Sequence, residues 1–551
     1  MRVVAVDTKL LMVPDKAFYH PGEAVTLAVS AAEGTQVEAT VYYLSETVAT
    51  LRGTLADGQA ALTWTPPANA LRGYGIDAQV LDASGQVVAS GSTAFDVLDK
   101  WIQAPRYGFL SDFRAERPDP TETMAEAAAY HVNGLQFYDW QYRHEQLLPP
   151  AEALSGAAET YADVLGKLES LTTIKQLIEA AHEHNIAAMP YSAIYGASYA
   201  FYDQHPDWAL FSAKDQPYDF AGFLKIMDPT PGSPWATHLL SEYADVLNKT
   251  AFDGIHIDQY GAPMHGLNAA GDYVKLEDAF PVFIDATAAL VHQLRGDEGV
   301  TIFNLVRNWP IKTVAPSDED AVYIELWDPY TTFLDLPRVV AQAQALGGGK
   351  PVIIAAYIHA KQFPYARLAN ALIFASGGYH LELGEPSAML ADPYFPKFDL
   401  MSEADQEIER RYYDFLVRYE NVLALNTHDG GKDRAGALTI EHVETGGYSL
   451  TDRVVVVVRA ANDGRAETFS LVNLWGIGKG HWDGFGLSPA AIDDLNVQIQ
   501  VTKPVARVWL ASPDGESSAM QAVDFTSADG KISFNVPSLD YWTMVVVEYQ
   551  A

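Results

Sequence analysis

Hydrophobic and polar residues alternate with a period of about two in short segments near both ends of the chain. Turn-forming runs such as Pro21-Gly22, Asp57-Gly58 and Asn462-Asp463-Gly464 separate these segments. Short, regularly spaced strands with such turns are typical of β-sandwiches. We therefore predict an immunoglobulin-like β-sandwich over residues 1–100 and a second, C-terminal β-sandwich over residues 421–551. The supporting segments are 25–29, 36–42 and 75–81, and then 453–459, 497–501, 506–510 and 542–548.

Between these ends, strand-like segments alternate with helical ones. Residues 172–184 place their apolar side chains on one helical face, and Ser233-Pro234 has the sequence of a helix start. Eight alternating units in about 300 residues predict a (β/α)8 TIM barrel over residues 101–420. A doubly wound open sheet is the alternative. The eight predicted strands are 107–110, 134–138, 186–191, 252–258, 301–305, 321–325, 351–357 and 378–383.

The fourth and the sixth of these strands each end in a carboxylate. His256 and Asp258 share one face of the fourth strand, and Tyr323 and Glu325 share one face of the sixth. The apolar faces of barrel strands pack against the helices, so the other faces point inward and bring Asp258 and Glu325 to the barrel mouth. Such a pair suits glycoside hydrolysis, in which one carboxylate attacks or assists and the other donates a proton.

Acidic residues outnumber basic ones by 71 to 36, which gives a net charge of −35. This charge argues against a nucleic-acid partner, which needs clustered Lys and Arg, and suits solubility or a neutral substrate. The absence of cysteine excludes disulfides, zinc–thiolate sites and thiol nucleophiles. No run of about eighteen apolar residues predicts a membrane span. The apolar run within Met1–Asp7 is too short for a signal peptide, so we expect a cytoplasmic chain or an extracellular one whose signal was removed.

Three longer motifs resemble those of a known family. Residues 107–113 (YGFLSDF), 133–144 (NGLQFYDWQYRH) and 253–261 (DGIHIDQYG) are similar to barrel motifs of glycoside hydrolase family 66, the dextranases and cycloisomaltooligosaccharide glucanotransferases. The resemblance spans all three predicted domains in order. It implies retaining hydrolysis of α-1,6-linked glucan by an aspartate nucleophile after the fourth strand and a glutamate acid/base after the sixth. Those roles fall on Asp258 and Glu325.

Both carboxylates also have a structural interpretation, Asp258 as a cap of the following loop and Glu325 as an ion-paired residue. A nucleophilic Asp258 must be ionised, whereas Glu325 must begin protonated. An apolar setting raises the pKa of a carboxyl, and Tyr323 and Trp327 offer such a setting to Glu325. We expect the other acids near the strand ends to bind sugar hydroxyls or to support the catalytic pair; they are Asp139, Asp328, Glu382 and Glu385.

Aromatic and polar side chains near the strand ends are candidates for substrate binding, because sugars stack their C–H faces on rings and need polar partners for their hydroxyls. For the aromatic residues, packing inside the barrel is the alternative. We predict no metal and no cofactor, and we interpret the acidic run 318–320 as solvated surface, with calcium binding as its alternative. The candidates are Tyr138, Asp139, Trp140, Tyr142, His144, Tyr191, Tyr195, His256, Gln259, Tyr260, Asn304, Trp309, Trp327, Asp328, Tyr357, His380, Glu382 and Glu385.

The sequence thus predicts a monomeric, retaining endo-hydrolase of dextran and isomaltooligosaccharides. Two alternatives stay open: a cycloisomaltooligosaccharide glucanotransferase that works by intramolecular transglycosylation, and a non-catalytic glucan-binding protein. The resemblance implies that cyclising members carry an extra carbohydrate-binding module in the later part of the barrel domain. Between Glu385 and the C-terminal strands there is room only for a loop and a helix over residues 402–419, which favours the hydrolase.

Overall fold

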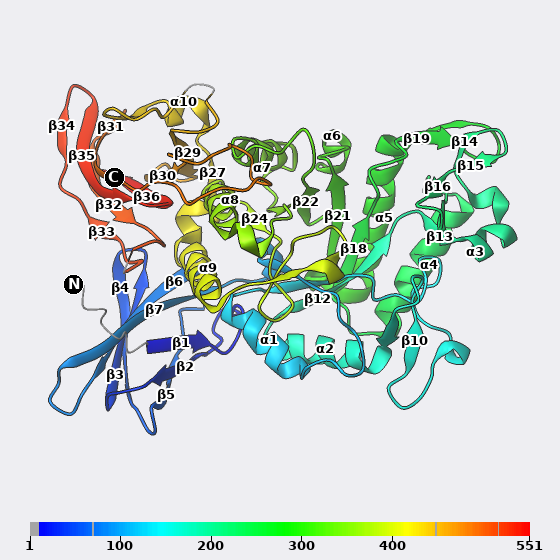
Figure 1. Cartoon of the computed structure of the whole chain (residues 1–551), viewed down its shortest axis with the longest axis horizontal. Helices are drawn as coiled ribbons and strands as arrows, with labels where there is room; N and C mark the ends of the chain where they lie inside the picture. The colour runs from blue at the N-terminus through cyan, green and yellow to red at the C-terminus, as the bar shows by residue number, and fades with distance from the viewer. Residues whose placement is uncertain (1–9, 69–70, 447–448, 516, 551) are drawn as a thin grey trace.

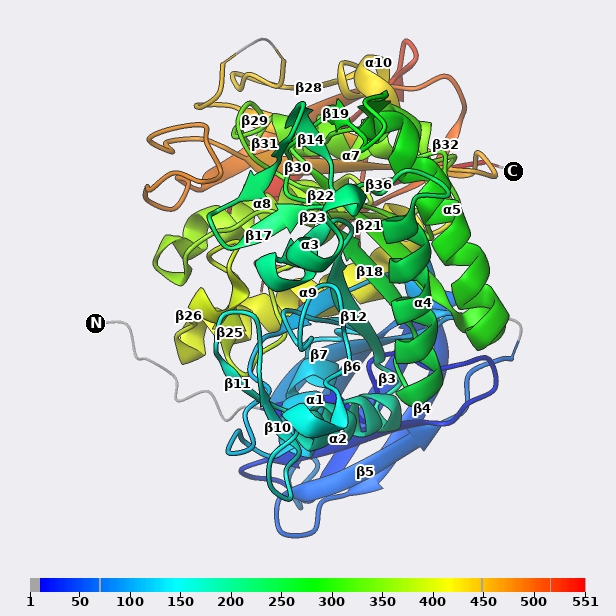
Figure 2. The same ribbon diagram turned by 90° about the vertical axis from the view of Figure 1, so that its right-hand side faces the viewer.

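The computed structural model describes residues 10–68, 71–446, 449–515 and 517–550. The apolar start of the chain, Met1–Asp7, lies outside the described residues. In Figure 1 the central barrel fills the right-hand part of the molecule, and the N-terminal and C-terminal sheets lie together at the other end. Figure 2 looks onto the barrel end of this elongated arrangement.

Eight parallel strands form the central sheet, and each is hydrogen-bonded to the next one along the chain. This order never reverses, unlike that of a doubly wound sheet. The backbone N–H of Phe109 in the first strand donates to the carbonyl of Leu383, just after the last, at 2.9 Å, which joins the two ends into a barrel. All eight predicted strands are confirmed. They are β8 (Tyr107–Leu110), β9 (Gly134–Phe137), β12 (Ala187–Ala193), β18 (Gly254–Asp258), β21 (Val300–Val306), β22 (Ala321–Glu325), β23 (Val352–Ala355) and β24 (Tyr379–His380).

The closure of the barrel depends on a glycine. Gly384 follows the last strand with φ +154°, and a Cβ there would lie 1.9 Å from the carbonyl oxygen of Phe109. Only a residue without a side chain permits this approach between the first and last strands.

Helices cover the outside of the barrel. The two helices predicted from the pattern are α2 and α4; at the start of α4 the Ser233 hydroxyl accepts a hydrogen bond from the Ala236 N–H at 3.0 Å. The helix expected over 402–419 is also present and extends to Leu423. The helices that follow the eight strands are α1 (Pro120–Ala129), α2 (Leu171–Glu183), α4 (Pro234–Lys249), α5 (Leu276–Arg295), α6 (Ile311–Val314), α7 (Asp335–Leu346), α8 (Phe363–Ala375) and α9 (Glu403–Leu423).

The inward faces of the strands meet as their alternation predicted. The His256 ring stacks on Tyr107 with a centroid distance of 5.8 Å and meets the edge of Tyr323 at 4.9 Å. Tyr107 belongs to the first strand, His256 to the fourth and Tyr323 to the sixth, so these three rings fill the barrel interior below Asp258 and Glu325. The two carboxylates therefore lie at the ends of strands with a packed interior beneath them.

Two antiparallel sheets precede the barrel and share one apolar core. This agrees with a sandwich, while its immunoglobulin-like type and the boundary at residue 100 remain predictions. One sheet contains β1 (Leu10–Pro14), β2 (Val25–Ala31) and β5 (Gln59–Trp64), and the other contains β4 (Glu46–Thr54), β3 (Gln36–Tyr43), β6 (Arg72–Leu81) and β7 (Val87–Val97).

Two further antiparallel sheets follow the barrel. The six-stranded one presents one face to its partner sheet and the other to the barrel, since Val455, Val457 and Val472 belong to the barrel's core cluster. The boundary at residue 421 remains a prediction. The strands are β27 (Thr427–Asp429), β29 (Val454–Ala461), β30 (Ala466–Asn473), β36 (Trp542–Tyr549), β32 (Val505–Ala511) and β33 (Gln521–Ala522), and then β28 (Leu438–Ile440), β31 (Ile492–Gln500), β35 (Lys531–Leu539) and β34 (Thr526–Ala528).

Small sheets beyond β12 and β18, at the right of Figure 1, were not predicted from the sequence. Their strands are two or three residues long, so they leave no detectable alternation. They contribute walls to the cavity described below. The elements are β13 (Gly196–Ser198), α3 (Tyr199–Gln204), β14 (Phe211–Ala213), β15 (Gln216–Pro217), β16 (Asp219–Phe220), β17 (Leu224–Ile226), β19 (His265–Leu267) and β20 (Tyr273–Lys275).

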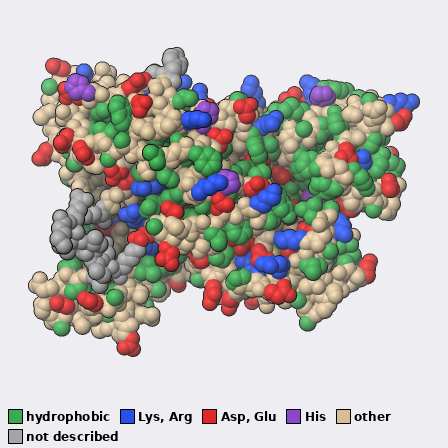
Figure 3. All heavy atoms as spheres, in the orientation of Figure 1, with side chains coloured by type: hydrophobic (Ala, Val, Ile, Leu, Met, Phe, Trp, Pro, Cys, Tyr) green, Lys and Arg blue, Asp and Glu red, His purple; other side chains and the backbone are tan. Residues whose placement is uncertain are grey.

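Acidic and basic side chains are interspersed over the face shown in Figure 3. Within the described residues, no helix combines the length and the apolar character needed to cross a bilayer.

Candidate active site

A cavity of about 530 Å³ opens at the carboxyl ends of the barrel strands. Asp258 ends β18, Glu325 ends β22, and Asn304 lies on β21 between them. Tyr191 reaches the cavity from β12 and Tyr357 from the loop after β23. In this fold the carboxyl ends of the strands are where catalytic residues gather.

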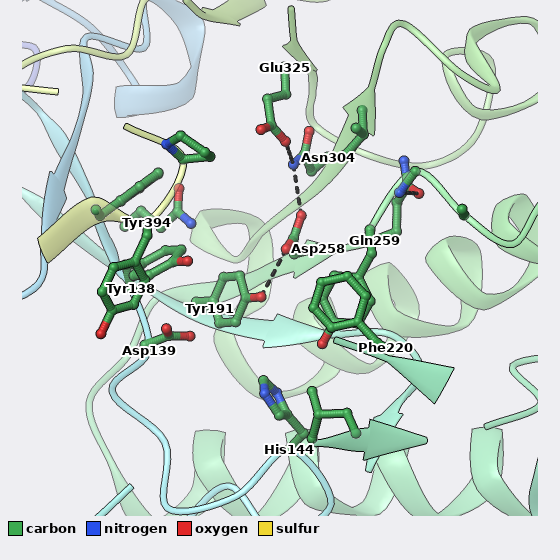
Figure 4. A pocket seen from close by; sticks show the side chains of 18 of the residues that line it. Tyr138, Asp139, His144, Tyr191, Phe220, Asp258, Gln259, Asn304, Glu325 and Tyr394 are labelled. Atoms are coloured by element: carbon green, nitrogen blue, oxygen red, sulfur yellow. Dashed lines mark hydrogen bonds between the residues drawn. The ribbon is translucent and has the colours of Figure 1, made fainter. Parts of the chain in front are cut away.

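The two carboxylates share one hydrogen-bond donor. The side-chain amide of Asn304 donates to Oδ1 of Asp258 at 2.7 Å and to Oε2 of Glu325 at 2.8 Å (Figure 4). These two distances add to 5.5 Å, which is the greatest separation possible between the two oxygens. The Tyr191 hydroxyl donates to the other Asp258 oxygen at 2.8 Å, and the Trp327 indole N–H donates to Oε1 of Glu325 at 2.9 Å.

Burial raises the pKa of both carboxyls. For Asp258 the pKa rises to about 7, with burial as the main cause and the charge of Glu325 as the next. The pKa of Glu325 is also raised by burial, against hydrogen bonds from Asn304, Trp327 and Tyr357 that favour the charged form. Both carboxyls therefore favour the protonated form more than an exposed acid does.

Aromatic rings form the side walls of the cavity. Tyr138 stacks on Phe395 with a centroid distance of 4.2 Å, and Tyr260 stacks on Phe220 at 4.0 Å. The rings come from loops that are far apart in the chain. Apolar walls around a few convergent polar groups are the usual make-up of a small-molecule site.

Two further titratable side chains line the cavity on the side of β9. Burial raises the pKa of Asp139 to about 7, and the nearby charge of Asp163 adds to this rise. Burial lowers the pKa of His144 to about 4, so this imidazole is neutral at physiological pH. Both side chains are therefore able to exchange hydrogen bonds with hydroxyl groups.

Eleven of the twenty residues singled out from the sequence line this cavity. They are Tyr138, Asp139, His144, Tyr191, Asp258, Gln259, Tyr260, Asn304, Glu325, Trp327 and Tyr357.

Five of the remaining nine occupy positions in or around the barrel core. Trp140 is fully buried against Phe252 and donates its indole N–H to the Tyr191 carbonyl at 3.1 Å. The guanidinium of Arg143 covers the ring of Tyr142. The other three also serve the framework: the Tyr195 hydroxyl accepts the Tyr260 N–H at 2.8 Å, His256 fills the barrel interior, and the Trp309 ring packs on Phe280.

The other four are acids and a histidine near strand ends. Asp328 lies in an exposed turn. His380 is buried between the Asn370 side chain and the Ala356 carbonyl, at 2.6 and 3.0 Å. Glu382 accepts a hydrogen bond from the Tyr413 hydroxyl, at 3.2 Å.

Glu385 is the last of these acids. It accepts the backbone N–H groups of Ser111 and Asp112, both at 2.8 Å, and pairs with Arg117 at 3.2 Å. These contacts join His380, Glu382 and Glu385 to framework residues, and none of the three lines the cavity.

Several cavity residues were not found from the sequence. Most of them lie in loops or in very short strands, where no periodic pattern marks them, and the cluster Pro393-Tyr394-Phe395 after the last strand was the available signal there. Gln136, Val306 and Tyr323 lie on barrel strands, where the alternation was visible but was not used to choose them as binding residues. The residues are Gln136, Val164, Leu165, Phe220, Phe223, Leu224, Gly261, Ala262, Val306, Arg307, Tyr323, Pro393, Tyr394 and Phe395.

The described part of the chain contains no group of three or more His, Asp or Glu side chains placed to hold a metal ion. In the acidic run at 318–320, Glu319 is buried and the Asp320 carboxylate accepts the Thr301 N–H at 2.8 Å, so two of the three acids are not solvated surface. The prediction of a solvated run was wrong for these two, because the run lies against the start of β21.

Comparison with known sequences identifies the family. A profile described as glycosyl hydrolase family 66 matches residues 14–546, nearly the whole chain.

The chain belongs to glycosyl hydrolase family 66.

Relatives of this family 66 chain include a cycloisomaltooligosaccharide glucanotransferase from Niallia circulans, 24% identical over 707 aligned positions that cover 97% of this chain and 71% of the relative. A dextranase from Streptococcus salivarius is 23% identical over 579 positions, covering 86% and 67%. A solved Paenibacillus sp. cycloisomaltooligosaccharide glucanotransferase, complexed with cycloisomaltoheptaose, superposes with a TM-score of 0.88 at 22% identity, covering 97% of this chain and 99% of that one. The fold is thus shared along nearly the whole chain.

Proposed function

We propose that this family 66 protein is a retaining endo-hydrolase of α-1,6-glucan. The carrying observation is the separation of at most 5.5 Å between the hydrogen-bonded oxygens of Asp258 and Glu325. Retaining glycosidases hold their carboxyl groups about 5–5.5 Å apart, whereas inverting ones leave about 6.5–9.5 Å for a water molecule. The close pair therefore supports double displacement.

In the proposed reaction Asp258 attacks the anomeric carbon while Glu325 donates its proton to the departing glycosidic oxygen. The C–O bond to the leaving chain breaks, and a covalent glycosyl ester forms on Asp258. Glu325, now ionised, takes a proton from water, whose oxygen displaces the ester and restores both carboxyl groups. Asn304 and Tyr191 hold the attacking carboxylate in place through the hydrogen bonds already described.

The choice of α-1,6-glucan as substrate rests on the relatives. One is named a dextranase and another a cycloisomaltooligosaccharide glucanotransferase. The stacked ring walls and the neutral His144 suit an uncharged sugar, which offers C–H faces and hydroxyls. Endo action is the expectation that comes with the family resemblance.

Intramolecular transglycosylation is the second candidate, because two of the relatives carry that name. The alignment with them extends over 707 and 710 positions although this chain has 551 residues, so those relatives contain additional internal segments. Only 22 residues separate β24 from α9 here, which leaves no space for an extra module at that point. The alignment with the dextranase is also longer than the part of this chain that it covers, 579 positions for 86%, so the support for hydrolysis comes from the short segment between β24 and α9 alone.

The proposal is tested by incubating the protein with dextran, starch and cellulose and separating the products by chromatography. We expect linear isomaltooligosaccharides from dextran and no products from starch or cellulose. An Asp258→Ala variant serves as the control for contaminating activity. A wild-type protein that binds dextran but releases no reducing ends would instead be a glucan-binding protein, and the proposal would fail.

A further inference from the structure

A loop from the C-terminal sheets is inserted into the barrel mouth. We call residues 474–486, which follow β30, the strap; Figure 1 shows the orange C-terminal segment reaching the barrel beside α7. Trp482 of the strap is only 3% exposed and belongs to the apolar cluster of the barrel, not to the core of the C-terminal sheets. The strap is therefore part of the barrel's packing.

One side of the strap is hydrogen-bonded to the loop that follows β22. The Phe333 N–H donates to the Gly480 carbonyl at 2.9 Å, and the Trp482 N–H donates to the Thr331 carbonyl at 3.0 Å. The Trp482 indole N–H donates to the Tyr330 carbonyl at 2.8 Å. These bonds fix the backbone of the loop at Tyr330, Thr331 and Phe333.

The other side of the strap holds the loop that follows β23. The Gln362 side-chain amide donates to the Gly484 carbonyl, while its oxygen accepts the His359 N–H at 3.1 Å. The Tyr365 hydroxyl lies 3.4 Å from the Lys479 carbonyl. A single segment thus bridges two neighbouring loops of the barrel mouth.

Both of these loops carry a side chain that contacts Glu325. Trp327 belongs to the first loop and donates to the carboxylate at 2.9 Å, and Tyr357 belongs to the second and hydrogen-bonds the same group. The Trp327 and Tyr357 rings are in contact, tilted by 55° with a centroid distance of 6.0 Å. A turn in which the Tyr330 N–H donates to the Trp327 carbonyl at 2.8 Å connects the strap's anchor to Trp327.

We propose that Trp482 is a positioning residue for the acid/base: through Tyr330 it holds Trp327, and Trp327 aims the carboxyl of Glu325 at the leaving-group oxygen. The inference rests on the proposed role of Glu325. It gives the C-terminal sheets a part in the chemistry, because the strap leaves from β30. A proton donor that is not held in one orientation loses rate in the step that needs the proton, and substrate binding is unaffected.

The test is a double-mutant cycle on Trp482→Phe and Trp327→Phe, measured on dextran and on a nitrophenyl α-isomaltoside, whose leaving group needs little protonation. Trp482→Phe keeps an aromatic side chain, smaller than the indole, and removes the N–H that binds the Tyr330 carbonyl. We expect kcat on dextran to fall about tenfold with KM unchanged, and kcat on the nitrophenyl substrate to change less than about twofold. In the Trp327→Phe background, Trp482→Phe should lower kcat on dextran less than about twofold, because the hydrogen bond from residue 327 to Glu325 is already lost.

Leu487→Ser is the matched control, since this residue adjoins the strap and is 81% exposed; its kcat should equal that of the wild type. Equal losses on both substrates, or the same loss in both backgrounds, would overturn the positioning role.

If Trp482→Phe does not fold, His481→Ala takes its place in the same cycle with the same expectations. This variant removes a 3.1 Å contact with the Thr331 hydroxyl. Glu325→Gln separates the two hypotheses: if it shows no leaving-group dependence, the proposed function fails; if it does and the cycle is additive, only the strap's role fails.

Discussion

Asp258 and Glu325 lie on strands that are two places apart in the barrel, and their carboxylates are bridged by one side-chain amide. Asn304, on the strand between them, donates to both. A single amide nitrogen therefore sets the distance between the two groups, and the packed rings of Tyr107, His256 and Tyr323 below fix the strands that carry them. The geometry of the pair comes from three successive strands rather than from loops.

Asn304→Ala should impair catalysis more than stability. Both carboxylates lose a donor, and the electrostatic repulsion between them is no longer offset, so we expect kcat on dextran to fall on the order of 10–100-fold. Asn421→Ala is the control, because the Asn421 side chain also makes two backbone hydrogen bonds, to Gly73 and Leu71, far from the cavity. Steady-state kinetics with a melting curve for each variant separates the two effects; a similar loss of kcat in both would refute the bridging role.

Replacing the two acids one at a time should give different chemical signatures. Asp258→Gly should abolish turnover, and azide should restore it with inversion, because a small nucleophile fits the vacated space. Glu325→Gln should suppress dextran cleavage severely but spare an activated leaving group. Proton NMR of the first-formed anomer reports the stereochemistry. Azide rescue of Glu325→Gly with no rescue of Asp258→Gly would reverse the assignment.

The pH dependence should show the proposed roles of the two groups. In the wild type, kcat/KM should follow a bell: it falls on the acid side as Asp258 is protonated and on the alkaline side as Glu325 loses its proton. Burial is the main cause of the raised pKa of Asp258, so the acid limb should lie above the pH expected for an exposed aspartate. On that limb Glu325 is already protonated and uncharged, so Glu325→Gln should leave the acid limb in place and remove the alkaline limb. Profiles measured on the nitrophenyl substrate test this; an alkaline limb that persists in the variant would contradict it.

The sequence located the two carboxylates of the candidate site because the strands that carry them are periodic. His256 with Asp258, and Tyr323 with Glu325, share strand faces, and a barrel turns such faces inward. The same reasoning selected His380 at the end of β24 and Glu382 just after it, and neither residue lines the cavity. Their side chains contact Tyr413 and Asn370 on the outer helices, and no spacing in the sequence distinguishes the two outcomes.

The residues that form the cavity walls could not be predicted from the sequence, for a different physical reason. Phe220 and Tyr394 come from loops after the third and the eighth strand, where backbone direction is set by short sheets and turns rather than by alternation. The contact between Phe220 and Tyr260 joins residues 40 positions apart through a two-residue strand. Nor does any local pattern reveal that the strap from β30 reaches Thr331 and Tyr330.

Asp258→Asn should stabilise the fold at alkaline pH. The folded-state pKa of Asp258 is raised from 3.8 to about 7, so its contribution to the stability is present below about pH 4 and is lost as the pH rises through 7. A shift of this size corresponds to on the order of 4 kcal/mol. We expect the variant to melt higher than the wild type at about pH 8, with a smaller difference at about pH 5. Calorimetry at both pH values measures the difference in melting temperature. A variant that melts lower than the wild type at about pH 8 would show that the ionised Asp258 carboxylate does not destabilise the fold.

The product spectrum decides between hydrolysis and cyclisation. A cyclising enzyme must keep the far end of the donor chain near the glycosyl ester until it attacks, whereas water needs no such retention. The residues between β24 and α9 form only the short strands β25 (Ala388–Met389) and β26 (Asp399–Leu400) and the turn η6 (Phe395–Lys397), so no added module retains the chain there. Water should therefore capture the ester, and linear isomaltooligosaccharides should dominate from the first minutes of a dextran digest. Mass spectrometry separates the two series, because cyclic products are lighter than linear ones by one water. Cyclic species as the major early products would show that the chain is a glucanotransferase and would overturn the hydrolase proposal.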